Sequence, residues 1–101
     1  MVKVKKSEYI KISRTVVRKL FDSNCFGKGS VYIEVLKSAV PKEHLDKVDA
    51  VVEALIKQKI CLKKKKKHGW KYFLNMDRYD KIREIIKEVG PNSIITLLLK
   101  L

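Results

Sequence analysis

The sequence is short of the residues that build disulfide-stabilised folds and catalytic sites. Among 101 residues there are two cysteines, Cys25 and Cys61, and two histidines. Two cysteines are too few for a disulfide framework, so we expect a reducing compartment and a cytoplasmic protein. Two histidines leave no plausible set of nucleophile, base and orienting acid. We therefore predict no catalytic residues and no enzyme.

Residue types that bind zinc are present, but their spacing is wrong. No two of Cys25, His44, Cys61 and His68 have the close spacing that holds zinc. The simpler interpretation is a small buried thiol at Cys61 and a surface imidazole at His68. The sequence therefore predicts no metal site and no cofactor.

Long hydrophobic runs are also missing. No apolar stretch approaches the roughly 20 residues that a membrane-spanning helix needs. The sequence begins MVKVKK and no apolar segment follows it. We therefore expect neither a signal peptide nor a membrane partner.

Acidic residues are scarce relative to basic ones, and the excess positive charge is unevenly placed. The chain has 24 Lys and Arg against 11 Asp and Glu, a net charge of +13. Residues 59–75 hold seven lysines and no acid, and residues 1–21 hold seven Lys or Arg with one Glu. So basic a chain favours a polyanionic partner, and these two segments are expected to meet it.

Hydrophobic periodicity predicts a mostly α-helical α+β fold with a small β-hairpin, in one domain covering residues 1–101. The expected helices cover residues 8–21, 31–38, 42–58, Asn75 or Asp77 to Val89, and 92–101, with 76–101 as a C-terminal helical extension. Two segments keep an alternative: residues 31–38 can begin in a strand, and residues 92–101 can be a strand. Along the third helix, apolar positions from Leu45 to Ile56 form the side expected to be buried.

The segment ICLKKKKKHGWKYFL, residues 60–74, predicts a β-hairpin with a lysine run near its tip. Cys61–Lys64 and Trp70–Leu74 are rich in β-forming residues or alternate in polarity, and the Lys-Lys-His-Gly stretch between them can turn. Its aromatic side chains can stack on bases if they are exposed. We favour the other interpretation, in which Trp70 and Tyr72 share one strand face and cover the core.

In this order of helix, short helix, helix, hairpin and helix, residues 8–75 resemble a winged helix-turn-helix domain. Residues 31–38 and 42–58 correspond to the helix-turn-helix, and residues 61–74 to the wing. The segment VVEALIKQKICLKKKKKHGWKYFLN is similar to the end of the recognition helix and the wing of small bacterial and archaeal repressors. The resemblance implies a protein that binds double-stranded DNA and acts in transcription regulation, with wing lysines on the phosphate backbone.

The charge distribution and the resemblance together predict the nucleic-acid-binding residues. They are Lys63, Lys64, Lys65, Lys66, Lys67, His68 and Lys71 of the hairpin, Lys11, Arg14 and Arg18 opposite the apolar side of the first helix, and Lys42 and Lys47 at the start of the third. The lysine run has another interpretation, a solvated loop whose charge prevents edge pairing and aggregation. We favour nucleic-acid contact because the charge exceeds what solubility needs.

The third helix departs from the family's pattern, in which this helix presents polar and basic side chains to the major groove. Its polar face carries Glu43, Asp46 and Glu53, with Asp49 beside them. Phosphate repels carboxylates, so we expect the wing and the first helix to lead binding, or the third helix to face a protein partner. The alternative functions are a non-catalytic RNA- or ribonucleoprotein-binding protein and a winged-helix protein-interaction module.

The end of the chain, IITLLLKL, is too apolar to remain in water. It either completes the core or pairs with a second chain. In small winged-helix proteins an added terminal element often makes the dimer, so the resemblance favours a homodimer.

Overall fold

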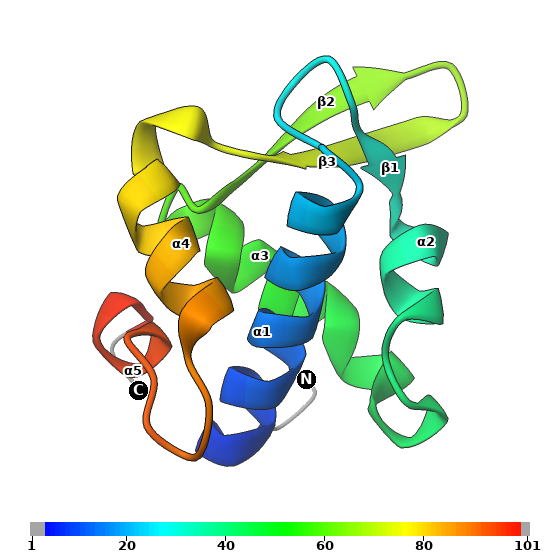
Figure 1. The fold of residues 1–101 in the computed structure, drawn as a ribbon. Helices are drawn as coiled ribbons and strands as arrows, with labels where there is room; N and C mark the ends of the chain where they lie inside the picture. Colours follow the sequence, from blue (N-terminus) through cyan, green and yellow to red (C-terminus); the bar gives the residue numbers. More distant parts are fainter. Residues whose placement is uncertain (1–3, 100–101) are drawn as a thin grey trace.

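A computed structural model describes residues 4–99. Within them the fold is α+β, with a three-stranded antiparallel sheet on one side of the helices (Figure 1). The α-helices are α1 (Lys6–Asp22), α2 (Ile33–Ser38), α3 (Val48–Lys57), α4 (Tyr79–Lys87) and α5 (Ile95–Leu98). The 3-10 helices are η1 (Lys42–Lys47) and η2 (Met76–Arg78), and the strands are β1 (Val31–Tyr32), β2 (Cys61–Lys66) and β3 (Gly69–Leu74). None of the helices in this part of the chain has both the length and the apolar character needed to cross a bilayer.

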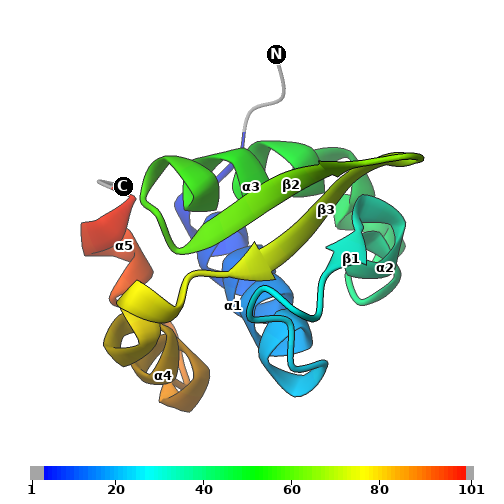
Figure 2. The same cartoon turned by 90° about the horizontal axis from the view of Figure 1, so that it is seen from above.

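The central helix is α1, which contacts α2, α3, α4, α5 and β3. Ile12, Val16 and Leu20 recur at helical spacing, and each is at most 1% exposed. The predicted amphipathic helix is therefore confirmed, and α3 and α4 pack against different sides of it (Figures 1 and 2).

The predicted hairpin is confirmed. Strands β2 and β3 pair antiparallel along their whole length, and β1 adds to the other edge of β3 in the order β1-β3-β2. The turn is Lys67–His68, followed by Gly69 at φ +126°. Residues with a Cβ atom rarely adopt this backbone conformation, so the turn depends on glycine at this position.

One buried apolar cluster joins the helices to the base of the hairpin. Leu36 of α2, Leu55 of α3, Leu74 of β3, Ile85 of α4 and Ile95 of α5 are each at most 1% exposed. The base of the hairpin is therefore held by the same core as all five α-helices, while its other end extends beyond that core (Figures 1 and 2).

Two helices in the first half of the chain begin differently from the main prediction. Residues 31–38 start in β1, which was the alternative kept open, and continue as α2. Residues 42–58 were predicted as one helix, but 42–47 wind as the 3-10 helix η1 and only Val48–Lys57 is α-helical. In this 3-10 helix, the side chains of His44 and Lys47 contact Glu8 of α1. The predicted buried side is confirmed, since its apolar positions are buried or packed against the core.

The C-terminal part has helical segments at both predicted places. Asn75 caps the first, its side chain accepting from the backbone N–H of Asp77 at 3.1 Å. Helix α4 ends at Lys87, two residues before the predicted Val89, because Glu88 turns to an extended conformation. The Glu88 carboxylate then accepts from a backbone N–H at the start of the tail, at 2.5 Å.

The apolar tail folds back onto the domain. Ile95 is fully buried and its neighbours pack against the core, so the described part of the tail completes the core, one of the two expected outcomes. The predicted helix over 92–101 is shorter, with α5 covering Ile95–Leu98, and residues 100–101 lie outside the described residues.

Candidate nucleic-acid interface

The two faces of the hairpin follow from its register, because successive side chains of a strand point to opposite faces. Cys61 and Leu74 are paired across the strands, face the core and are at most 1% exposed. Toward the tip, the same face carries Lys63, Lys65 and Trp70. One continuous face therefore changes from core to basic surface along the hairpin.

Trp70 is exposed at the basic end of this face. Its side chain is 42% exposed, whereas Tyr72 is 8% exposed. The prediction that both cover the core is confirmed for Tyr72 and wrong for Trp70, because the hairpin at Trp70 has already passed beyond the core. Lys63 Nζ and Lys65 Nζ lie 4.7 and 5.3 Å from the centre of the indole ring. The ring is therefore flanked by two ammonium groups.

The opposite face of the hairpin holds lysines that are engaged within the protein. Lys64 Nζ donates to the carbonyl of Gly27 at 2.6 Å and lies 5.4 Å from the centre of the Phe73 ring. Lys71 Nζ lies 5.1 Å from the centre of the Tyr32 ring. Both side chains are partly buried, so they are less available to a partner than their sequence position indicated.

Four basic residues at the end of the hairpin are exposed: Lys65, Lys66, Lys67 and His68, called the hairpin tip below. No ion pair between described residues involves any of them. Among the hairpin residues predicted to bind nucleic acid, those of the hairpin tip therefore have the fewest contacts within the protein.

The carboxylates of α3 are paired with lysines of neighbouring elements. Glu53 Oε1 lies 3.3 Å from Lys63 Nζ of β2, and Asp49 Oδ2 lies 3.4 Å from Lys37 Nζ of α2. The other two predicted acidic positions belong to η1, so the acidic face is divided between two elements. Exposed pairs of this kind contribute little to stability, but each pair partly neutralises one α3 carboxylate.

The two predicted basic residues at the start of the third helix have different surroundings. Lys42 is exposed. Lys47 forms an ion pair with Glu8 of α1, and the side chains are 17% and 18% exposed. His44 Nδ1 lies 3.3 Å from the same carboxylate. Lys47 stays a predicted nucleic-acid contact, although Glu8 of α1 supplies its counter-charge.

This ion pair shifts the pKa of both partners. The Lys47 ammonium, and then the backbone N–H of Lys5, lower the pKa of Glu8 below its ordinary value of 4.5. The Glu8 carboxylate raises the pKa of Lys47 above its ordinary value of 10.5. Glu8 therefore stabilises the fold above the pKa it has when unfolded, and this contribution is lost as the pH falls through its lowered folded pKa. The contribution of Lys47 is present below pH 10.5 and is lost as the pH rises through its raised folded pKa.

We expect Glu8→Gln to lower the free energy of unfolding at neutral pH and to have a smaller effect in acid. At neutral pH the substitution removes the partner of Lys47, whereas in acid the wild-type carboxyl is itself protonated. Urea unfolding at several pH values between about 7 and 3 measures the difference. Glu84→Gln, at an exposed position of α4, is the control. An equal effect of Glu8→Gln across this range would contradict the ion-pair assignment.

Arg14 lies beneath the segment that follows α4. It is 9% exposed, with Nη1 donating to the carbonyl of Gly90 at 2.6 Å and Nη2 to that of Asn92 at 2.5 Å. Nη2 also lies 3.4 Å from Glu88 Oε2. Arg14 stays a predicted nucleic-acid contact, although the C-terminal segment folds over this side of α1 and leaves it largely buried.

Arg18 is held by the same segment, and Lys11 is not. Arg18 Nη2 donates to the carbonyls of Ile86 and Glu88 at 3.3 and 2.7 Å. Arg18 is therefore partly engaged within the protein and stays a predicted nucleic-acid contact. Lys11 remains exposed, as expected.

Three carboxylates each pair with one of the predicted basic residues, and none of these pairings was predicted. They are Glu8, Glu53 and Glu88, whose partners lie 39, 10 and 74 positions away. No local pattern indicates contacts between residues that far apart.

Both cysteines are buried, and burial raises the pKa of the Cys61 thiol to about 12. Within residues 4–99, no three His, Cys, Asp or Glu side chains are grouped so that they could hold a metal ion.

Comparisons with protein-family models, curated proteins and solved structures find no match to this chain. The site is therefore interpreted from its own geometry and charge.

Proposed function

We propose that this protein is a winged helix-turn-helix protein that binds double-stranded DNA and acts in transcription regulation. Two features support the proposed family. A short strand lies between α1 and α2, and an antiparallel hairpin follows α3 and pairs with that strand. In this proposal, α2 and α3 form the helix-turn-helix, and β2 and β3 form the wing.

The observation that carries the proposed function is the exposed hairpin tip. It holds three consecutive lysines with no ion pair to any described residue, at the end of a hairpin that extends beyond the core. An exposed ammonium acts as a point charge for a phosphate and releases a condensed counterion when it binds. The tip would therefore supply affinity and position, while α3, with its paired carboxylates, would contribute little attraction to phosphate.

We expect the triple substitution of Lys65, Lys66 and Lys67 by alanine to weaken duplex binding about equally for all sequences. If each lysine contacts one phosphate, the slope of log K against log salt should become shallower by about 2.7, since each contact contributes about 0.9. Near 0.15 M salt, this corresponds to a loss of affinity on the order of 100-fold. Fluorescence anisotropy of labelled duplexes over a salt series measures both quantities.

The matched control replaces Lys81, Arg83 and Lys87 of α4 by alanine, which removes the same charge at positions away from the hairpin. This control should change the salt slope much less. If the two triple variants weaken binding equally, only net charge matters and the tip is not the contact surface. If neither variant changes binding, the lysine run is a solubility device.

Single-stranded RNA is a second candidate partner, and the exposure of Trp70 favours it. A half-exposed indole beside lysines is suited to stacking on an unpaired base, which contributes about 1–3 kcal/mol per base. Trp70→Ala separates the two partners: a large loss with single-stranded RNA and none with duplex DNA would support RNA as the ligand.

The homodimer stays a prediction. Ile95 is buried within the chain, but Leu97 of α5 and Val89 before it are 78% and 85% exposed. Among the described residues of the C-terminal segment, these two apolar side chains are exposed and a second copy could cover them.

A further inference from the structure

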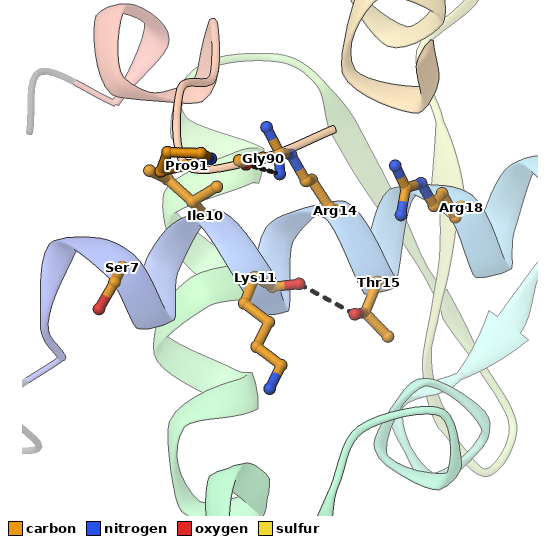
Figure 3. Close-up of a pocket in the computed structure, with 8 residues that line it drawn as sticks. All are labelled: Ser7, Ile10, Lys11, Arg14, Thr15, Arg18, Gly90 and Pro91. Atoms are coloured by element: carbon orange, nitrogen blue, oxygen red, sulfur yellow. Dashed lines mark hydrogen bonds between the residues drawn. The ribbon is translucent and has the colours of Figure 1, made fainter. Parts of the chain in front are cut away.

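A pocket of about 420 Å³ lies beside α1, away from the hairpin tip (Figure 3). Its lining residues are Ser7, Ile10, Lys11, Arg14, Thr15 and Arg18 of α1, with Gly90 and Pro91 of the segment after α4. This volume falls in the range of small-molecule sites, about 300–1,000 Å³.

The lining of the pocket is basic. Lys11, Arg14 and Arg18 are three of its eight residues, and none of the eight is acidic. Glu88 offsets Arg14, whereas Lys11 and Arg18 form no ion pair with any described residue. An anion bound beside Lys11 and Arg18 would offset positive charge that no described carboxylate neutralises.

Donor groups remain available for such an anion. The described hydrogen bonds of Arg18 use Nη2 alone, so its Nε and Nη1 retain their N–H groups. The Lys11 ammonium has no hydrogen-bond partner among residues 4–99, and its backbone carbonyl accepts from Thr15 Oγ1 at 2.9 Å. The unused N–H groups of a guanidinium and a flexible ammonium on one helix suit the several oxygens of a phosphate group.

The pocket is on the side of α1 that faces away from α3. Val16 and Leu20 pack into the shared core together with residues of α3, whereas Lys11 and Arg18 project from the opposite side of the helix. Figures 1 and 2 place the hairpin tip far from the Gly90 segment. A ligand in the pocket is therefore physically separate from a nucleic acid at the tip.

We propose that this pocket binds a small phosphate-bearing molecule. Lys11 and Arg18 would hold the phosphate oxygens, while Ile10 and Pro91 provide apolar contact for the rest of the molecule. Because the pocket joins α1 to the Gly90–Pro91 segment, binding also stabilises the docking of that segment on α1. This inference does not depend on DNA binding.

The test is isothermal titration of the intact protein with inorganic pyrophosphate at about 0.15 M salt. Lys11→Ala should weaken pyrophosphate binding roughly tenfold, because one charge-assisted hydrogen bond is lost. Lys6→Ala, at another exposed lysine of α1 outside the pocket, is the matched control and should change affinity less than about twofold. Lys11 has no other described partner, so its removal should leave the fold intact.

Two further measurements separate a small ligand from nucleic acid. The triple alanine variant at Lys65, Lys66 and Lys67 should bind pyrophosphate normally, and Lys11→Ala should weaken duplex binding less than the triple variant does. The proposal is overturned if pyrophosphate does not bind at millimolar concentration, or if Lys6→Ala weakens it as much as Lys11→Ala. It is also overturned if Lys11→Ala weakens duplex binding as strongly as the triple variant, since the pocket would then belong to the nucleic-acid surface.

Discussion

Arg14→Met should lower the free energy of unfolding by about 3–5 kcal/mol, because it removes one partner of a largely buried ion pair. The Arg14 and Glu88 side chains are 11% and 19% exposed. Methionine preserves most of the apolar stem but leaves the Glu88 carboxylate without its cation. The carbonyls of Gly90 and Asn92 also lose their charged donor. Urea unfolding followed by circular dichroism measures the loss.

Arg83→Met is the matched control, because Arg83 is exposed on α4 and its described contact is with the Tyr79 ring. It should cost less than about 1 kcal/mol. The Arg14→Met/Glu88→Gln double variant should lose less unfolding free energy than the sum of the losses of the two single variants. The reason is that Glu88→Gln removes the charge that Arg14→Met leaves without its cation. Equal losses for Arg14→Met and Arg83→Met would show that the Arg14 contacts do not hold the C-terminal segment.

Leu74→Ala should destabilise the protein by about 2–5 kcal/mol, the range for removing a large buried side chain. Leu74 is 1% exposed at the end of β3, within the cluster that contains residues of all five α-helices. Its truncation leaves a cavity where the base of the hairpin meets the core. Because the hairpin tip depends on this anchor, amide hydrogen exchange in β2 and β3 should also accelerate.

Leu62→Ala makes the same chemical change on the other face of the hairpin. Leu62 pairs with Phe73, is partly exposed and is not a member of the buried cluster. Its truncation should cost less than half as much as Leu74→Ala, since the loss follows the area buried. Comparable losses at the two positions would contradict the assignment of one hairpin face to the core.

Much of the fold could be predicted because its elements depend on local patterns. The apolar positions of α1 recur with a helical period, and residues 60–74 alternate between strand faces around a Gly-containing turn. The boundaries were less predictable. Helix α4 stops at Lys87 because Glu88 bonds to the tail, and residues 42–47 adopt a 3-10 helix beside α1. The 3-10 helix depends on α1, which is distant in the sequence, whereas the end of α4 depends on a contact only six residues further along the chain.

The candidate site shows the same division. The charge pattern indicated that the hairpin carries the largest excess of lysine. It did not distinguish Lys65, Lys66 and Lys67, which are exposed, from Lys63 and Lys64, which bond to Glu53 and to the carbonyl of Gly27.

By itself, the sequence determined the helical and hairpin segments, most of the faces that are buried, and the two regions with excess positive charge. These properties depend on residue type and on periods of about 3.6 and 2 residues, which are visible in a linear chain. Tertiary structure alone decided which charges are free. Arg14 and Lys47 look like surface cations in the sequence, yet each meets a carboxylate more than thirty positions away. Such pairings arise when helices pack, because the energy of a charge depends on its neighbours in space and on its burial, not on its neighbours along the chain.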